Sequence, residues 1–240
     1  MIKLRSAVAE RLNRLQEVKS PVYPIGEMLE KLMSLDDARW GMYAFSRDPV
    51  EGKFSIGEKR VYAQKANACG HEEAVCLKSN GGGYTPEDIA GKLGAAIVEK
   101  NAPAGGGHVI FAQYEETGTV ILFKDCLDQL DRIRQGYPDV PFPNREEVRS
   151  ILLYHELFHH IEHKKKNSIY TQTEKVELWK KPFSNRSRIL ALSEIAAMAF
   201  AREMAGAGYS PFILDVLLVY AYNREAASAL YEEILDMEER

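Results

Sequence analysis

Apolar residues recur at helical spacing along much of this chain, and the strongest such pattern begins directly after Asn144. Asn144 can cap a helix, and Glu146 and Glu147 bring negative charge to the first turn. The pattern ends in the basic run HKKK, so both ends of the predicted helix complement its dipole. The apolar flanks SILLY and LF indicate that most of this helix is buried.

Helical patterns also dominate the two ends of the chain. Residues 1–45 predict two or three helices, with apolar positions at helical spacing between Val8 and Val18 and a helix start in SLDDARW. Towards the other end, helices are predicted over about 188–205 and 211–223, followed by an acidic helical end. The run SPFILDVLLVYAY is typical of a helix buried in the core.

The part between these helical ends gives mixed signals. β-like runs at 59–64 and 74–78 are followed by a turn of three glycines. Thr85 then begins a helix, because it can act as the cap and Pro86 suits the first helical position. Two β-rich runs flank a short polar turn at Gly118 and predict a hairpin within HVIFAQYEETGTVILFKD.

Two connections complete the secondary-structure prediction. A helix is expected over 125–134, and three prolines then make YPDVPFPN an extended segment. Residues 167–187 are polar and mixed, which indicates a loop with one short helix around Trp179. A second turn of three glycines, before the hairpin, lacks the Lys-Ser/Thr of a phosphate-binding loop and is expected to be only a turn.

These patterns together predict an α+β fold, with a mixed early portion and a helical late portion. We expect one domain over residues 1–240. Within it, residues 1–45 form an N-terminal helical segment, 46–143 an α/β portion, and 144–240 a helical portion.

Composition narrows the class of protein. Hydrophobic residues make up 45% of the chain and charged residues 28%, so it can form a sizeable core without a metal to hold it together. A net charge of −4 argues against nucleic-acid binding. No stretch reaches the roughly 20 apolar residues that span a bilayer, and the start lacks the apolar core of a signal peptide. Three cysteines, an odd and sparse set, suit a reducing compartment, so we expect a cytoplasmic protein.

The candidate chemistry lies in HELFH, an H-E-x-x-H sequence formed by His155, Glu156 and His159 on the strongest predicted helix. Residues four apart share one helix face about one turn from each other, so the two imidazoles can bind a single zinc ion. Glu156 beside them can reach a water that the metal activates and act as the general base. The alternative is a core helix whose histidines are satisfied by hydrogen bonds. The buried setting of three polar side chains favours one zinc ion per chain.

The third ligand has to come from elsewhere. The candidates are the glutamates Glu174, Glu177, Glu194 and Glu203. Glu194 is the best of them, because it lies in an apolar, alanine-rich helix where an isolated carboxylate would be costly to bury. Its small neighbours Ala196, Ala197 and Ala201 would allow that helix to pack closely on the histidine helix. The alternative is a glutamate exposed near a helix start.

The remaining histidines of this helix are poor ligand candidates. His163 lies two turns from His155, about 12 Å along the helix axis, which is too far to share its zinc. His160 points roughly 100° away from His159. A surface histidine and a helix-end cation are therefore expected.

Other reactive side chains carry weaker signals. Cys69, His71 and Cys76 lack a fourth ligand nearby, so we expect buried or half-buried thiols in place of a second metal site. Several tyrosines could donate to the oxyanion of a tetrahedral intermediate, and the sequence cannot choose among them. They are Tyr154, Tyr170, Tyr220 and Tyr222.

H-E-x-x-H followed on a later helix by E-x-x-A-x-x-F-A resembles the gluzincin metallopeptidases, and in particular the ImmA/IrrE family. The second motif reads Glu194, Ala197, Phe200 and Ala201. The resemblance covers roughly residues 108–205. It implies a zincin-like fold, in which a small mixed or antiparallel sheet and an active-site helix precede a helical portion. It also implies that His155, His159 and Glu194 bind zinc, with Glu156 as the general base.

The resemblance implies a place for the substrate as well. In zincins an edge strand beside the active helix pairs with the extended substrate, and Gly118 to Lys124 is the candidate for that strand. The segment 167–187 could then form one rim of the cleft, or it could be an ordinary surface connection.

The leading hypothesis is therefore a zinc metallopeptidase that acts on a peptide or protein substrate, with neither nucleic acid nor membrane as a partner. A zinc-containing regulatory or binding protein without hydrolytic activity is the alternative from another class. Hydrolysis of a non-peptide amide or ester would use the same metal site, and the sequence does not separate it from peptide hydrolysis. The oligomeric state stays open.

Overall fold

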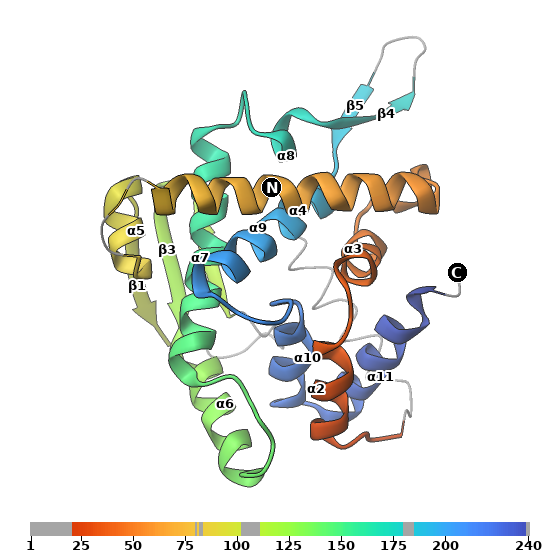
Figure 1. Ribbon diagram of the computed structural model, residues 1–240, viewed down its shortest axis with the longest axis vertical. Coiled ribbons are helices and arrows are strands. Elements are labelled where there is room, and N and C mark those ends of the chain that lie inside the picture. Colours follow the sequence, from red (N-terminus) through yellow and green to blue (C-terminus); the bar gives the residue numbers. More distant parts are fainter. Residues whose placement is uncertain (1–20, 80, 82–83, 102–110, 180–184, 239–240) are drawn as a thin grey trace.

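The computed structural model describes residues 21–79, 81, 84–101, 111–179 and 185–238. These residues form helices together with two small sheets, so the α+β prediction is confirmed (Figure 1). The first half holds α2 (Ile25–Met33), α3 (Asp37–Ser46), the 3-10 turn η1 (Glu51–Lys53), α4 (Ile56–Ser79), α5 (Pro86–Leu93), β1 (Ala96–Lys100), β2 (Ala112–Glu115) and β3 (Thr119–Phe123). The second half holds α6 (Lys124–Gly136), α7 (Arg145–Lys164), α8 (Tyr170–Thr173), β4 (Lys175–Trp179), β5 (Asn185–Arg188), α9 (Leu190–Ala205), α10 (Ile213–Tyr220), α11 (Arg224–Leu235) and the 3-10 turn η2 (Asp236–Glu238).

The larger sheet has the strand order β1-β3-β2. β2 and β3 form the predicted hairpin, with Gly118 at a φ of 91° in its turn, a conformation that favours glycine. β1, which the sequence did not reveal, pairs with β3 in parallel. The expectation that Gly118 to Lys124 forms an edge strand is therefore wrong, because β3 lies in the middle of the sheet. Helix α7 packs against β2 and β3, and Figure 1 shows it beside the sheet.

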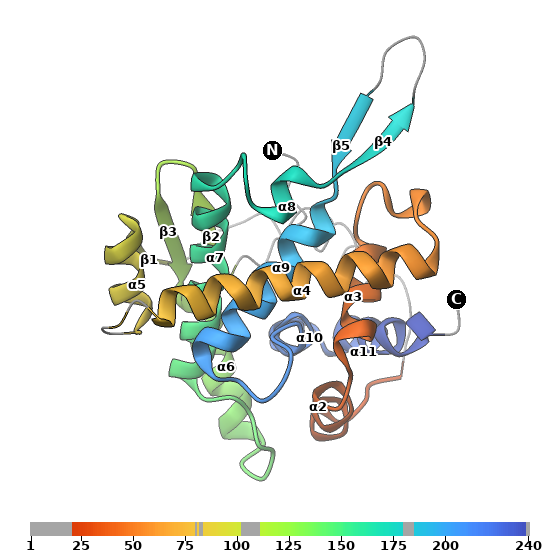
Figure 2. The same ribbon diagram turned by 45° about the horizontal axis from the view of Figure 1, so that its top comes forward.

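Helix α4 overturns the prediction of short strands at 59–64 and 74–78. Buried small residues recur three and four positions apart along it, at Ala63, Ala66, Gly70 and Ala74. At Ala63 this stripe lies against Gly41 of α3, and at Gly70 it lies against α9; Figure 2 shows α4 and α9 crossing. A Cβ at Gly70 would come within 2.1 Å of the Ala196 carbonyl oxygen, so the contact requires glycine. Tertiary packing of small residues thus outweighed the local β preference.

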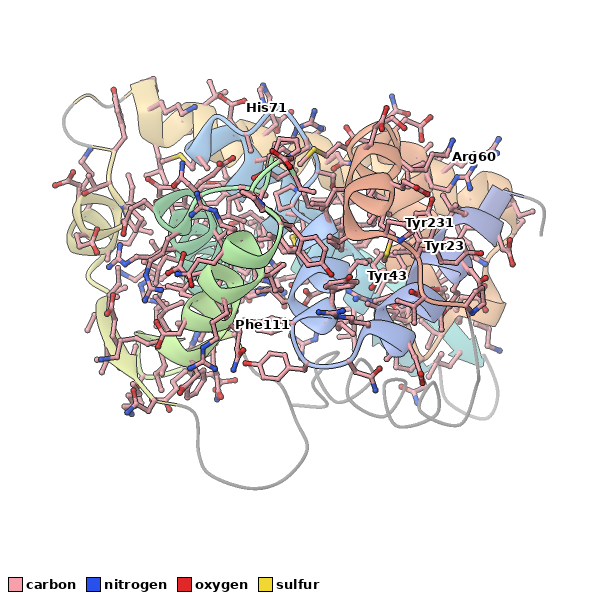
Figure 3. All side chains as sticks on the ribbon, turned by 90° about the horizontal axis from the view of Figure 1, so that it is seen from below. Tyr23, Tyr43, Arg60, His71, Phe111 and Tyr231 are labelled. Carbon is pink, nitrogen blue, oxygen red and sulfur yellow. The ribbon has the colours of Figure 1, made fainter. Side chains whose placement is uncertain are left out.

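The N-terminal helices follow their sequence signals. Asp36 accepts a hydrogen bond from the backbone N–H of Arg39 and begins α3 within SLDDARW, as predicted. The pattern between Val8 and Val18 lies outside the described residues. Tyr23, just before α2, meets Tyr231 of α11 edge to face at 5.4 Å, and Figure 3 shows these two rings together. The start of the described chain is therefore held against its last long helix.

The buried residues form a hydrophobic core cluster that extends from Ile25 to Ile234. The predicted helix in SPFILDVLLVYAY is confirmed as α10, which is buried along nearly its whole length. Its preceding residue Phe212 stacks on Trp40 at 5.7 Å and meets Tyr43 edge to face. Within the described residues, none of the helices combines the length and apolarity needed to cross a membrane.

The segment that joins α7 to α9 differs from the expected loop. It contains the single turn α8 and an antiparallel hairpin of β4 and β5, and Trp179 belongs to β4 and not to a helix. The hairpin projects from the helices in both Figure 1 and Figure 2. Helices α7 and α9, which carry the predicted ligands, are therefore separated in the chain by a protruding ribbon.

Candidate metal centre

The three predicted ligands converge at one point between α7 and α9. The Nε2 atoms of His155 and His159 lie 3.1 Å apart. Glu194 places one carboxylate oxygen 3.4 Å from His155 Nε2 and the other 3.8 Å from His159 Nε2. Zinc ligands at 2.0–2.1 Å in tetrahedral geometry are themselves separated by about 3.3 Å. The donor atoms therefore have the spacing that one tetrahedral ion requires.

A helix cap and an aromatic contact position the two helices that carry the ligands, α7 and α9. Asn144 accepts a hydrogen bond from the Glu147 N–H and caps α7, as predicted. Phe158 of α7 and Phe200 of α9 pack at 5.5 Å and hold the two helices together. The carbonyl oxygen of Ala196 approaches α4 at Gly70, and the expectation that Ala197 and Ala201 let α9 pack closely on α7 stays a prediction.

The end of α3 supports the helix that carries Glu194. Asp48 is 5% exposed and accepts a hydrogen bond from the Ala191 N–H at 2.7 Å, so it satisfies part of the first turn of α9. Next to it, the buried Arg47 donates to Asp215 at 2.5 Å. Neither residue was singled out from the sequence, because their burial depends on contacts with distant helices.

Electrostatics favours the ionised form of Glu194. Burial by itself would raise the pKa of this carboxyl group. The hydrogen bond and charge of His155, together with the charges of His159 and Arg47, outweigh burial and hold the pKa well below its ordinary value. Glu194 is therefore a carboxylate at neutral pH, which is the form that binds a metal.

Glu162 is a central residue that the sequence reasoning missed. It is 4% exposed, and its Oε2 accepts a hydrogen bond from His159 Nδ1 at 2.9 Å and from the Ser193 hydroxyl at 2.5 Å. Its Oε1 accepts from the Thr171 hydroxyl and from Gln172 Nε2. Burial by itself would raise the pKa of Glu162, but the hydrogen bond and charge of His159 and the hydrogen bonds from Ser193 and Thr171 together outweigh burial and lower the pKa.

The ionised Glu162 fixes the tautomer of His159. A carboxylate can only accept, so the Nδ1 of His159 must carry the proton that it donates. In the neutral imidazole, which is the form that binds a metal, the lone pair of His159 then lies on Nε2, the atom that faces His155 and Glu194. The signal in the sequence was present but weak: Glu162 follows His159 by three residues and so lies on the same side of a buried helix.

Glu156 directly follows His155 and is 2% exposed. A carboxylate this deep in a protein is costly unless the surroundings compensate it. Its place on α7 keeps it on the same turn as the two histidines, about 100° around the axis from His155. Its role as general base stays a prediction.

The remaining histidines of α7 hold the helix to the sheet. His160 is 5% exposed, so its expected surface position is wrong. Its Nε2 lies 3.1 Å from the Leu93 carbonyl oxygen and must donate, which leaves Nδ1 to accept from the Tyr114 hydroxyl at 3.1 Å. His163, which is exposed near the helix end as expected, has its Nδ1 3.0 Å from the same hydroxyl.

Among the described residues, the other candidate cysteines and histidines do not belong to this group of ligands. Cys69 is buried as expected, whereas Cys76 is exposed, and His71 lies 3.3 Å from Glu203. Two of the four candidate tyrosines have hydroxyl partners elsewhere: Tyr154 donates to the Tyr84 carbonyl, and Tyr220 pairs with Tyr137.

Among the described residues, His155, His159 and Glu194 form the one group of at least three histidine, cysteine, aspartate or glutamate side chains placed closely enough to hold a metal ion. Comparison with known proteins adds no relative. No protein-family model, curated protein or solved structure matches this chain.

Proposed function

We propose that this protein is a zinc-dependent peptidase with a zincin-like fold, in which His155, His159 and Glu194 hold one zinc ion. The observation that carries the proposal is the convergence of two imidazole Nε2 atoms 3.1 Å apart with a carboxylate from a second helix. Two imidazoles and one carboxylate are also the protein ligands of known hydrolytic zinc sites, which keep a fourth position open. When bound to such a set, zinc supplies Lewis acidity and makes hydroxide available near neutral pH.

The residues of the chain have distinct tasks in this proposal. Glu156, beside the ligands on α7, takes the proton of the attacking water and delivers it to the leaving amine. Glu162 holds His159 in the tautomer that presents Nε2. In this proposal an extended substrate pairs with the edge strand β2. β3 is excluded because it is the central strand, and β2 is favoured because it contacts α7.

The test compares wild type with Glu156→Gln, because this change keeps the size of the side chain and removes the base. We expect one zinc per chain in both proteins and at least about a 100-fold loss of peptide hydrolysis in the variant. Peptide cleavage can be followed by mass spectrometry on a mixture of unrelated peptides. Full activity in zinc-loaded Glu156→Gln would refute the mechanism. Zinc in both proteins without cleavage in either would favour the non-catalytic alternative.

A further inference from the structure

The β4–β5 hairpin, which we call the ribbon, is formed by residues 175–179 and 185–188. In the described part of the chain these two strands pair only with each other, so each has one edge without a strand partner. A two-stranded ribbon is marginally stable by itself, and a third strand would add main-chain hydrogen bonds. The ribbon therefore has the form of a strand-addition site.

The two faces of the ribbon differ in character. Val176 is half-buried and packs against the core, and it pairs with Ser187 on the inner face. The opposite face carries the cross-strand pair of Lys175 and Arg188, and next to it Arg186 opposite Glu177. All three basic residues are exposed. A chain of net charge −4 thus presents an outward face with three basic residues and one acidic residue.

A chain of hydrogen bonds joins the base of the ribbon to the candidate metal centre. Arg188 donates to Gln172 Oε1 at 2.7 Å, and Gln172 Nε2 donates to Glu162 Oε1 at 3.2 Å. Glu162 in turn accepts from His159 Nδ1 at 2.9 Å. Four residues from α7, α8 and β5 therefore connect the ribbon to a predicted zinc ligand through an unbroken chain of hydrogen bonds.

We propose that the ribbon is a docking site for an acidic, extended segment of the protein substrate, which adds to a ribbon edge as a third strand. Backbone pairing supplies affinity without demanding a particular sequence, and the exposed basic residues select acidic side chains. This inference rests on the proposed peptidase function, since it assigns the ribbon to the substrate. A nucleic acid would also be attracted to basic side chains, but it would not use the unpaired strand edges.

The test is a binding measurement that needs no cleavage. The probe is a fluorescein-labelled dodecapeptide of alternating Glu and Thr, followed by anisotropy at low salt with zinc-loaded Glu156→Gln protein. Comparison peptides carry Gln or Lys in place of Glu, and a fourth probe has alternate peptide nitrogens methylated so that one edge cannot pair. A single-stranded DNA oligonucleotide is the competitor. We expect the acidic peptide to bind, and the Lys and N-methylated peptides to bind at least about tenfold more weakly.

The charge contribution is tested with Lys175→Glu/Arg186→Glu, which reverses two exposed charges of the ribbon and leaves Arg188 in its hydrogen-bond chain. The matched control is Lys124→Glu/Arg132→Glu on α6, the helix at the opposite end of the molecule from the ribbon in Figure 1; both residues are exposed. We expect about a tenfold loss of peptide affinity for the ribbon pair and less than about twofold for the α6 pair.

Equal losses in the two double variants would overturn the proposal, as would an absence of saturable binding up to about 1 mM peptide. Displacement of the peptide by DNA that binds more tightly would identify a nucleic acid as the occupant instead. The zinc content of the same protein samples is measured as well. It distinguishes failure of the docking proposal, in which zinc is present but the peptide does not bind, from failure of the proposed zinc peptidase, in which zinc is absent. If the protein binds the peptide through the ribbon but holds no zinc, the docking site is supported and the proposed peptidase function is refuted.

Discussion

Replacing Glu162 with glutamine tests how the buried carboxylate organises the candidate metal centre. Glu162 accepts hydrogen bonds from four donors, among them His159 Nδ1 at 2.9 Å and the Ser193 hydroxyl at 2.5 Å. A glutamine keeps the shape but replaces one accepting oxygen with an amide nitrogen. If that nitrogen faces His159, the imidazole must accept at Nδ1 and carry its proton on Nε2, where it cannot bind a metal.

Loss of such a partner of a zinc-bound histidine weakens metal binding by about 10- to 100-fold, or about 1.4 to 2.7 kcal/mol. The assay is a competition with a fluorescent zinc chelator at fixed pH. Ser193→Ala is the matched control, because it removes one donor and keeps the carboxylate, and we expect its zinc affinity to fall less than about threefold.

Thermal unfolding of the metal-free proteins distinguishes this role from a general loss of stability. Glu162→Gln should show its main defect in zinc affinity, with a metal-free protein that still unfolds cooperatively. Unchanged zinc affinity in Glu162→Gln would refute the positioning role. So would an equal loss in Ser193→Ala, since the carboxylate is intact there.

Two further predictions concern the fold around the site. Burial raises the pKa of Cys69 to about 11 and that of Cys126 to about 12, so less thiolate exists at neutral pH and both should react slowly. The exposed Cys76 should be alkylated first by iodoacetamide, as peptide mass spectrometry can show; faster labelling of either buried thiol would contradict the packing of α4 or α6. Gly70→Ala should lower the free energy of unfolding in urea by about 3 kcal/mol, because its Cβ would lie 2.1 Å from a carbonyl oxygen of α9. Gly91→Ala, on α5 with open space around it, should leave stability unchanged or raise it by up to about 1 kcal/mol, and equal effects of the two changes would argue against the close α4–α9 contact.

Features encoded by local sequence were predicted well. The cap at Asn144 and the helical spacing of His155 and His159 follow from adjacent residues, and the structure has both. The choice of Glu194 used a weaker argument, the cost of burying an isolated carboxylate, and the structure brings that residue to the histidines. The hairpin around Gly118 had a clear local pattern as well.

Features that depend on distant contacts were not predictable in the same way. The runs predicted as β-strands are part of helix α4. The close packing of its Gly70 on α9, which lies far along the chain, could not be read from the local sequence. β1 is parallel to β3, and a parallel partner leaves no turn signal between the strands. His160 and Glu162 look like surface positions in a charged stretch. They are buried by the packing of β2 and α9 on α7, and residues of α8 hydrogen-bond to Glu162.

The central claim is that two helices share one metal ion, and its most direct test is the zinc content of purified protein by elemental analysis. Wild type should contain one zinc per chain, and His159→Ala and Glu194→Ala should contain little. Glu203→Ala is the matched control, because Glu203 lies on the same helix as Glu194 but pairs with Lys78, and it should retain full zinc. Stoichiometric zinc in Glu194→Ala, or no zinc in wild type after zinc is supplied, would contradict the proposed metal centre.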